Sequence, residues 1–170
     1  MRLRQAVFQF SVALAMVAAI SSSIAQSPFV DSPNRSIVKG AAVEYLFPEQ
    51  VTIPSGKPSP VVLHFRIAQG LHINSHTPHD DYLIPTNFAI PAESGVRLDI
   101  ANYPQGSDIT LPLDPKTKLS VYTGEFAIQA SIIAPPGNHL VQASLRFQAC
   151  DKSACMPPKT ITVPIDVIGQ

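Results

Sequence analysis

The chain has 170 residues, and its 12 basic and 12 acidic side chains give a formal net charge of zero. No run of basic residues is long enough to track a phosphate backbone, which argues against nucleic acid as a partner. The 17 prolines and 8 glycines interrupt the sequence too often for long helices, and they indicate many short strands joined by turns.

The first 25 residues have the pattern of a secretory signal peptide. Arg2 and Arg4 precede an apolar stretch at residues 6–20, and small residues then lead to an expected cleavage site after Ala25. The apolar stretch is shorter than the roughly 20 residues of a membrane span, although retention as an uncleaved anchor stays an alternative. We therefore expect a periplasmic or secreted protein, in an oxidising compartment where paired cysteines form disulfides.

The mature chain is expected to form a single domain. Residues 26–39 are polar, and we expect them to form a flexible N-terminal segment. The segment 40–170 is long enough to form one hydrophobic core. No apolar run in this part approaches the length of a bilayer span, so we expect no transmembrane segment in the mature chain.

Apolar and polar residues alternate with a period of two in several stretches, which is typical of half-buried strands. The clearest rows lie at residues 61–67, 126–132, 141–147 and 161–167, and weaker ones lie at 42–47, 84–90 and 96–103. Seven short strands with turns between them predict an all-β fold, an immunoglobulin-like antiparallel β-sandwich.

Three histidines, His72, His76 and His79, lie four and three residues apart. On one helix face these spacings would indicate a metal site, but Pro78 argues against a long helix there. The interpretation we favour is a solvated loop with unrelated histidines, and we assign no metal ligand and no cofactor.

The chain has only two cysteines, Cys150 and Cys155, five positions apart. A disulfide across so short a loop restrains the unfolded chain by roughly 2 kcal/mol, against about 4 kcal/mol or more for a loop of about 100 residues. The pair is therefore a poor structural staple and a candidate redox device. If the preceding strand keeps its alternation, Cys150 falls on the face of Arg146 and Gln148, near the surface, and residues 151–154 make a turn.

The run Gln-Ala-Cys-Asp-Lys-Ser-Ala-Cys-Met-Pro-Pro at 148–158 resembles the cysteine hairpin of the N-terminal, periplasmic domain of the bacterial thiol:disulfide interchange protein DsbD. The segments at 70–78, 82–86 and 121–126 resemble that family too, in the same order. The resemblance covers most of residues 40–168, and it implies an immunoglobulin-like sandwich that relays reducing equivalents by thiol–disulfide exchange.

By the same resemblance, Cys155 would bear the mixed disulfide with a partner and Cys150 would resolve it. Tyr122 lies where the family keeps a cap loop that shields the cysteines. The implied partners are thioredoxin-like or other disulfide-containing periplasmic proteins, with a membrane electron carrier supplied in trans. The direction of electron flow stays open. Whether the protein is an enzyme, a protein-disulfide reductase, also stays open, because a relay acts as substrate as much as catalyst.

Two alternatives stay open at this point. In the first, the cysteines form a permanent hairpin disulfide in a non-catalytic immunoglobulin-like binding module, because most disulfides of secreted proteins are structural. The second, more distant, is periplasmic copper binding. Its candidate ligands would be His72, His76, His79, Cys150, Cys155 and Met156.

Overall fold

The computed structural model describes residues 41–46, 49–112 and 114–170, all within one compact unit, Val38–Gln170. The expected signal peptide and the polar segment at 26–39 lie outside the described residues. Within the described part, regular structure consists of strands and one short 3-10 turn, η1 (Ala92–Ser94), and no helix is long and apolar enough to cross a bilayer.

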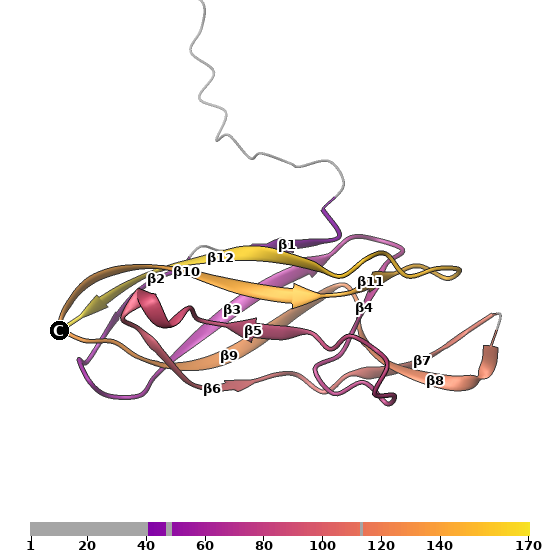
Figure 1. Cartoon of the computed structure of the whole chain (residues 1–170), viewed down its shortest axis with the longest axis horizontal. Helices are drawn as coiled ribbons and strands as arrows, with labels where there is room; N and C mark the ends of the chain where they lie inside the picture. Colours follow the sequence, from indigo (N-terminus) through magenta and orange to yellow (C-terminus); the bar gives the residue numbers. More distant parts are fainter. Residues whose placement is uncertain (1–40, 47–48, 113) are drawn as a thin grey trace, which may run out of the picture. The chain divides into compact units, whose positions relative to one another are not determined.

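Two four-stranded sheets form the body of the domain (Figure 1). The first has the order β1 (Val43–Tyr45), β3 (Ser59–Ile67), β9 (Glu125–Ile133) and β6 (Arg97–Asn102), with all neighbours antiparallel. The second has the order β2 (Glu49–Ile53), β12 (Lys159–Gly169), β10 (Gly137–Phe147) and β5 (Asn87–Ala89). Its neighbours are antiparallel except β2 and β12, which are parallel.

A third sheet is built from shorter pairings. Its order is β11 (Ala149–Cys150), β4 (His72–Asn74), β8 (Asp114–Tyr122) and β7 (Ser107–Leu111), all antiparallel. The chain passes from β10 of the second sheet into β11 of the third across a single residue, Gln148. The cysteine-bearing strand therefore continues a long strand of the sandwich and then changes its partner strand.

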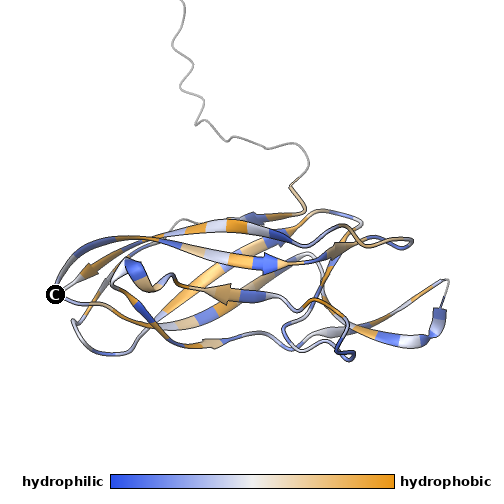
Figure 2. Ribbon diagram, in the orientation of Figure 1, coloured by the Kyte–Doolittle hydropathy of each residue, from blue (hydrophilic) through white to orange (hydrophobic). Residues whose placement is uncertain are grey.

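One hydrophobic core joins the first two sheets. Along β3, β9, β10 and β12 alternate residues are buried, and the hydropathy colours alternate in the same way (Figure 2). Phe65 and Leu63 of β3 and Phe147 and Ile165 of the facing sheet are almost fully buried in one cluster. Two sheets that bury one face each against the other form a sandwich, which confirms the predicted fold class.

Each of the seven predicted stretches contains a strand, and the structure adds five that the sequence pattern did not indicate: β2, β4, β7, β8 and β11. Two of the missed strands, β4 and β8, lack a regular period of two. All three residues of β4 are buried, and most of β8 is exposed and polar before its last three residues. Alternation identifies strands with one exposed and one buried face, and β4 and β8 have no such division along their length.

Candidate redox site

Cys150 and Cys155 form a disulfide that closes a tight hairpin. Their Cα atoms lie 3.9 Å apart, and the two residues form an isolated antiparallel bridge. The amide of Asp151 donates to the carbonyl of Ala154 at 2.9 Å, and the amide of Met156 donates to the carbonyl of Ala149 at 2.8 Å. Backbone pairing on both sides of the sulfurs therefore holds the cysteines opposite one another.

The Asp151 side chain fixes the turn. Its Oδ1 accepts the backbone N–H groups of Ser153 at 2.7 Å and Ala154 at 2.8 Å. Aspartate at the first position of a turn often accepts such bonds from the residues that follow. The bonds favour the charged carboxylate, so the pKa of Asp151 lies below its ordinary value.

The two cysteines differ sharply in exposure. Cys155 is exposed, whereas Cys150 is only 2% exposed. The expectation that Cys150 lies near the surface beside Arg146 is therefore wrong. Alternation continues to Ala149, but at β11 the chain pairs with β4, where both faces are covered, so the next residue is buried as well. An incoming sulfur reaches Cys155 first.

His72 lies directly opposite Cys150 in the pairing of β4 with β11. It was expected in a solvated loop, and the structure places it in a strand with 6% exposure. Its Nε2 is buried without a hydrogen-bond partner. Burial lowers the pKa of His72, and the nearby Asp151 carboxylate opposes that shift. The sequence showed His72 only as part of a spacing pattern, because cross-strand register cannot be read from the sequence.

Other buried polar side chains in β4 and next to it are hydrogen-bonded. Asn74 donates its Nδ2 to the carbonyl of Ile84 at 3.0 Å, and the Thr86 hydroxyl donates to the carbonyl of Asn74 at 2.6 Å. Ser75 and Ser120 share a hydroxyl hydrogen bond of 2.8 Å. These bonds attach the segment after β4 to the third sheet, as expected for buried polar groups.

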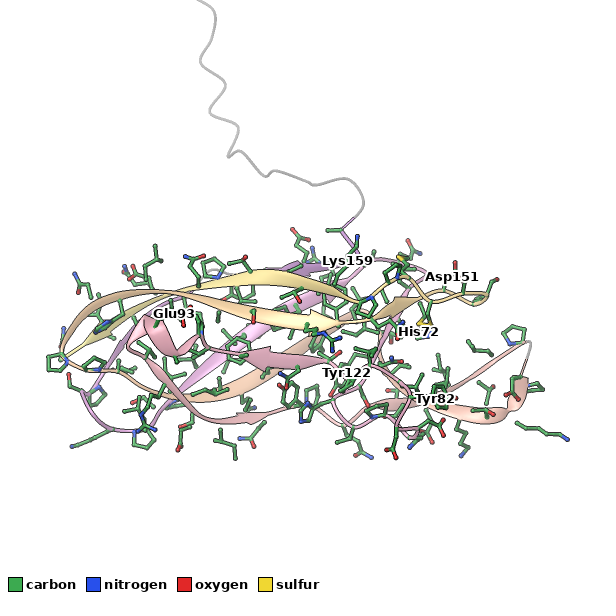
Figure 3. The ribbon with its side chains drawn as sticks, viewed as in Figure 1. His72, Tyr82, Glu93, Tyr122, Asp151 and Lys159 are labelled. Carbon is green, nitrogen blue, oxygen red and sulfur yellow. A yellow bond between two sulfur atoms is a disulfide. The ribbon has the colours of Figure 1, made fainter. Side chains whose placement is uncertain are left out.

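Tyr122 ends strand β8, is 4% exposed and stacks on Phe126 with ring centroids 4.9 Å apart. Its hydroxyl donates to the carbonyl of Pro104 at 2.9 Å and accepts the backbone N–H of His76 at 3.1 Å. Burial raises the pKa of Tyr122. Figure 3 labels Tyr122 near the middle of the view, and its low exposure places it in the interior. The residue anchors two loop segments, and its ring does not reach solvent.

The three histidines have separate environments. His76 stacks on Tyr103 with ring centroids 3.7 Å apart, and its Nδ1 lies 2.9 Å from the carbonyl of Thr86. His79 pairs with Asp108 at 2.8 Å on the surface. Within the described ranges, no three His, Cys, Asp or Glu side chains gather as metal ligands would. Among the described residues, the histidines and cysteines named for the copper alternative therefore do not form a group of three.

Comparisons with known proteins identify the family of this chain. No curated protein matches the chain significantly. Among solved structures, the reduced N-terminal domain of DsbD from Neisseria meningitidis aligns with 17% identity and a TM-score of 0.46, over 68% of this chain and 82% of that one. AggA, the major subunit of aggregative adherence fimbriae type I from Escherichia coli, aligns with 10% identity and a TM-score of 0.29, over 75% and 93%. The family described as thiol:disulfide interchange protein DsbD, N-terminal, matches residues 42–166, and the chain belongs to that family.

Proposed function

We propose that this protein relays reducing equivalents by thiol–disulfide interchange, with Cys150 and Cys155 as the exchanging pair. The observation that carries the proposal is the asymmetry of the pair: an exposed Cys155 is bonded to a buried Cys150 in a closed hairpin, in a chain of the DsbD N-terminal family. Reactive cysteines need access to a partner sulfur, and inert structural ones do not.

The asymmetry supports different roles for the two sulfurs. In the dithiol form, the Cys155 thiolate attacks a partner disulfide, a mixed disulfide forms and the partner's second sulfur leaves as a thiolate. Cys150 then attacks Cys155, which restores the Cys150–Cys155 bond and releases the partner as a dithiol. The pair loses two electrons and the partner gains them. Regeneration is the same exchange in reverse, with a donor dithiol.

The family supports thioredoxin-like proteins and other domains of DsbD-type systems as exchange partners, and it supports a periplasmic location. In the finer proposal, a membrane electron carrier reduces the hairpin in trans, and the signal peptide is cleaved after Ala25. Both steps are consistent with disulfide chemistry in an oxidising compartment.

We also propose that Tyr122 helps to shield the cysteine pair, through the hydrogen bonds of its hydroxyl. Its hydroxyl bonds tie the segment after β4, at His76, to the segment before β7, at Pro104. Strand β4, directly before the His76 segment, contacts the residue before the cysteine strand β11, since the backbone N–H of Asn74 donates to the carbonyl of Gln148 at 3.4 Å. Loosening it would expose the residues around β11.

Trapping tests the proposal. A Cys150→Ala variant, expressed in the periplasm with a thioredoxin-like partner, should accumulate mixed disulfides through Cys155, because the resolving thiol is missing. Non-reducing gels and mass spectrometry would identify them. Cys155→Ala is the matched control and should trap far less, because Cys150 is buried. Equal trapping by both variants, or none by either, would contradict the assigned roles.

A further inference from the structure

The cysteine hairpin has a buried neighbour that the exchange scheme does not yet use. His72 and Cys150 are direct partners across β4 and β11. Directly opposed residues of antiparallel strands project to the same face, with Cβ atoms roughly 5 Å apart. Figure 3 shows His72 and Asp151 at the same end of the domain. The imidazole therefore lies beside the cysteine that performs the resolving step.

The Nε2 atom of His72 is a buried polar atom that lacks a hydrogen-bond partner among the described residues. By contrast, Asn74 on the same strand is hydrogen-bonded through its amide. A buried nitrogen without a partner costs free energy. In the disulfide form Cys150 has no hydrogen to donate. Reduction gives it an S–H group, so a donor for Nε2 arises only in the dithiol form.

Cys150 needs a proton acceptor when it resolves a mixed disulfide. The thiolate is the nucleophile, burial among apolar groups raises a thiol's pKa, and at 2% exposure Cys150 cannot pass its proton directly to water. Burial lowers the pKa of His72 and so favours the neutral, accepting imidazole. The charged group that acts on His72 is Asp151. On the other side of β4, strand β8 presents Val121 and the neutral phenol of Tyr122.

We propose that His72 accepts the proton of the Cys150 thiol in the resolving step, an inference that rests on the thiol–disulfide function proposed above. Nε2 takes the proton as the Cys150 sulfur forms its bond to Cys155. The bond between Cys155 and the partner sulfur breaks, and its electron pair leaves with the partner thiolate. That thiolate takes up a proton from the imidazolium, directly or through water. The cysteine pair is oxidised by two electrons, and the partner disulfide is reduced.

A small aromatic disulfide with a coloured thiol product, dithiobis-nitrobenzoate, separates the two steps without a protein partner. Attack by Cys155 on this probe releases one coloured thiol, and resolution by Cys150 releases the second. The reduced wild-type protein should therefore show two phases in a stopped-flow experiment. His72→Phe and His72→Gln should leave the first phase within about twofold and slow the second about tenfold or more. His79→Gln, a change at an exposed histidine, is the matched control.

The pH profile distinguishes proton transfer from packing. In the wild type, the second phase should lose rate as the pH falls through the pKa of His72, below 6.5, because imidazolium cannot accept a proton. His72→Gln keeps a hydrogen-bonding group but does not titrate there, so its rate should rise with pH towards a thiol pKa of about 8.5 or above. An unchanged second phase in both variants, or a wild-type rate in His72→Gln, would overturn the role of His72. A wild-type protein without a second phase would instead overturn the proposed function itself.

Discussion

Replacing Tyr122 by Phe tests whether this residue acts as an anchor through its hydroxyl. The substitution removes the bonds to the Pro104 carbonyl at 2.9 Å and from the His76 amide at 3.1 Å. It keeps the ring and therefore the stack on Phe126. Two partly buried hydrogen bonds at about 1 kcal/mol each predict a loss of about 2 kcal/mol in the free energy of unfolding.

Urea unfolding of the oxidised protein measures this loss. With a slope of about 2 kcal/mol per M for a domain of this size, the midpoint should fall by about 1 M while the slope stays constant. Tyr82→Phe is the matched control, since Tyr82 is 74% exposed and its hydroxyl bond to Asp80 is long at 3.4 Å. It should change the free energy of unfolding by less than about 0.5 kcal/mol. If Tyr122→Phe behaved like Tyr82→Phe, the anchoring account would be refuted.

Two further substitutions test the hairpin and the third sheet. Asp151→Ala removes a carboxylate whose pKa is lowered by the Ser153 and Ala154 amides. The carboxylate therefore stabilises the folded state at pH values above its ordinary pKa of 3.8. This stabilisation is lost as the pH falls through the lower pKa that Asp151 has in the folded state. The melting temperatures of wild type and variant should therefore differ at pH ~5 and converge towards pH ~2; an equal difference at both values would show that the charge plays no part. Gly106→Ala should cost about 1–3 kcal/mol by overpacking, because an added Cβ would overlap the Ser120 hydroxyl and lie 2.8 Å from the Ser75 Cβ. An unchanged urea midpoint would show that this contact relaxes freely.

The sequence predicted the sandwich because each of its principal strands has one buried and one exposed face. The alternation at residues 61–67 and 141–147 corresponds to β3 and β10, whose alternate residues pack into one core. The turn at 151–154 was also predicted, and sheet pairing resumes at Lys159, opposite Phe147, after two prolines that lack amide donors. Local pattern and turn chemistry are sufficient for these features.

The inner part of the site could not be predicted in the same way. Cys150 and His72 meet through a pairing between strands about 80 residues apart in the sequence, and neither short strand has an alternating pattern that indicates its register. The exposure of Cys150 was predicted wrongly for the same reason, because alternation describes one sheet and the chain changes sheets at Gln148. The sequence contained both residues, but their contact depends on the tertiary fold.

The reduction potential of the Cys150–Cys155 pair tests the central claim most directly. The protein would be equilibrated with glutathione buffers of graded ratio, and the dithiol fraction would be measured by thiol alkylation and mass spectrometry. An exchanging pair should have a potential above about −300 mV, within the range in which cellular thiol carriers operate. A potential far below about −300 mV would contradict the account, because such a bond resists reduction and belongs to a structural hairpin in a binding module.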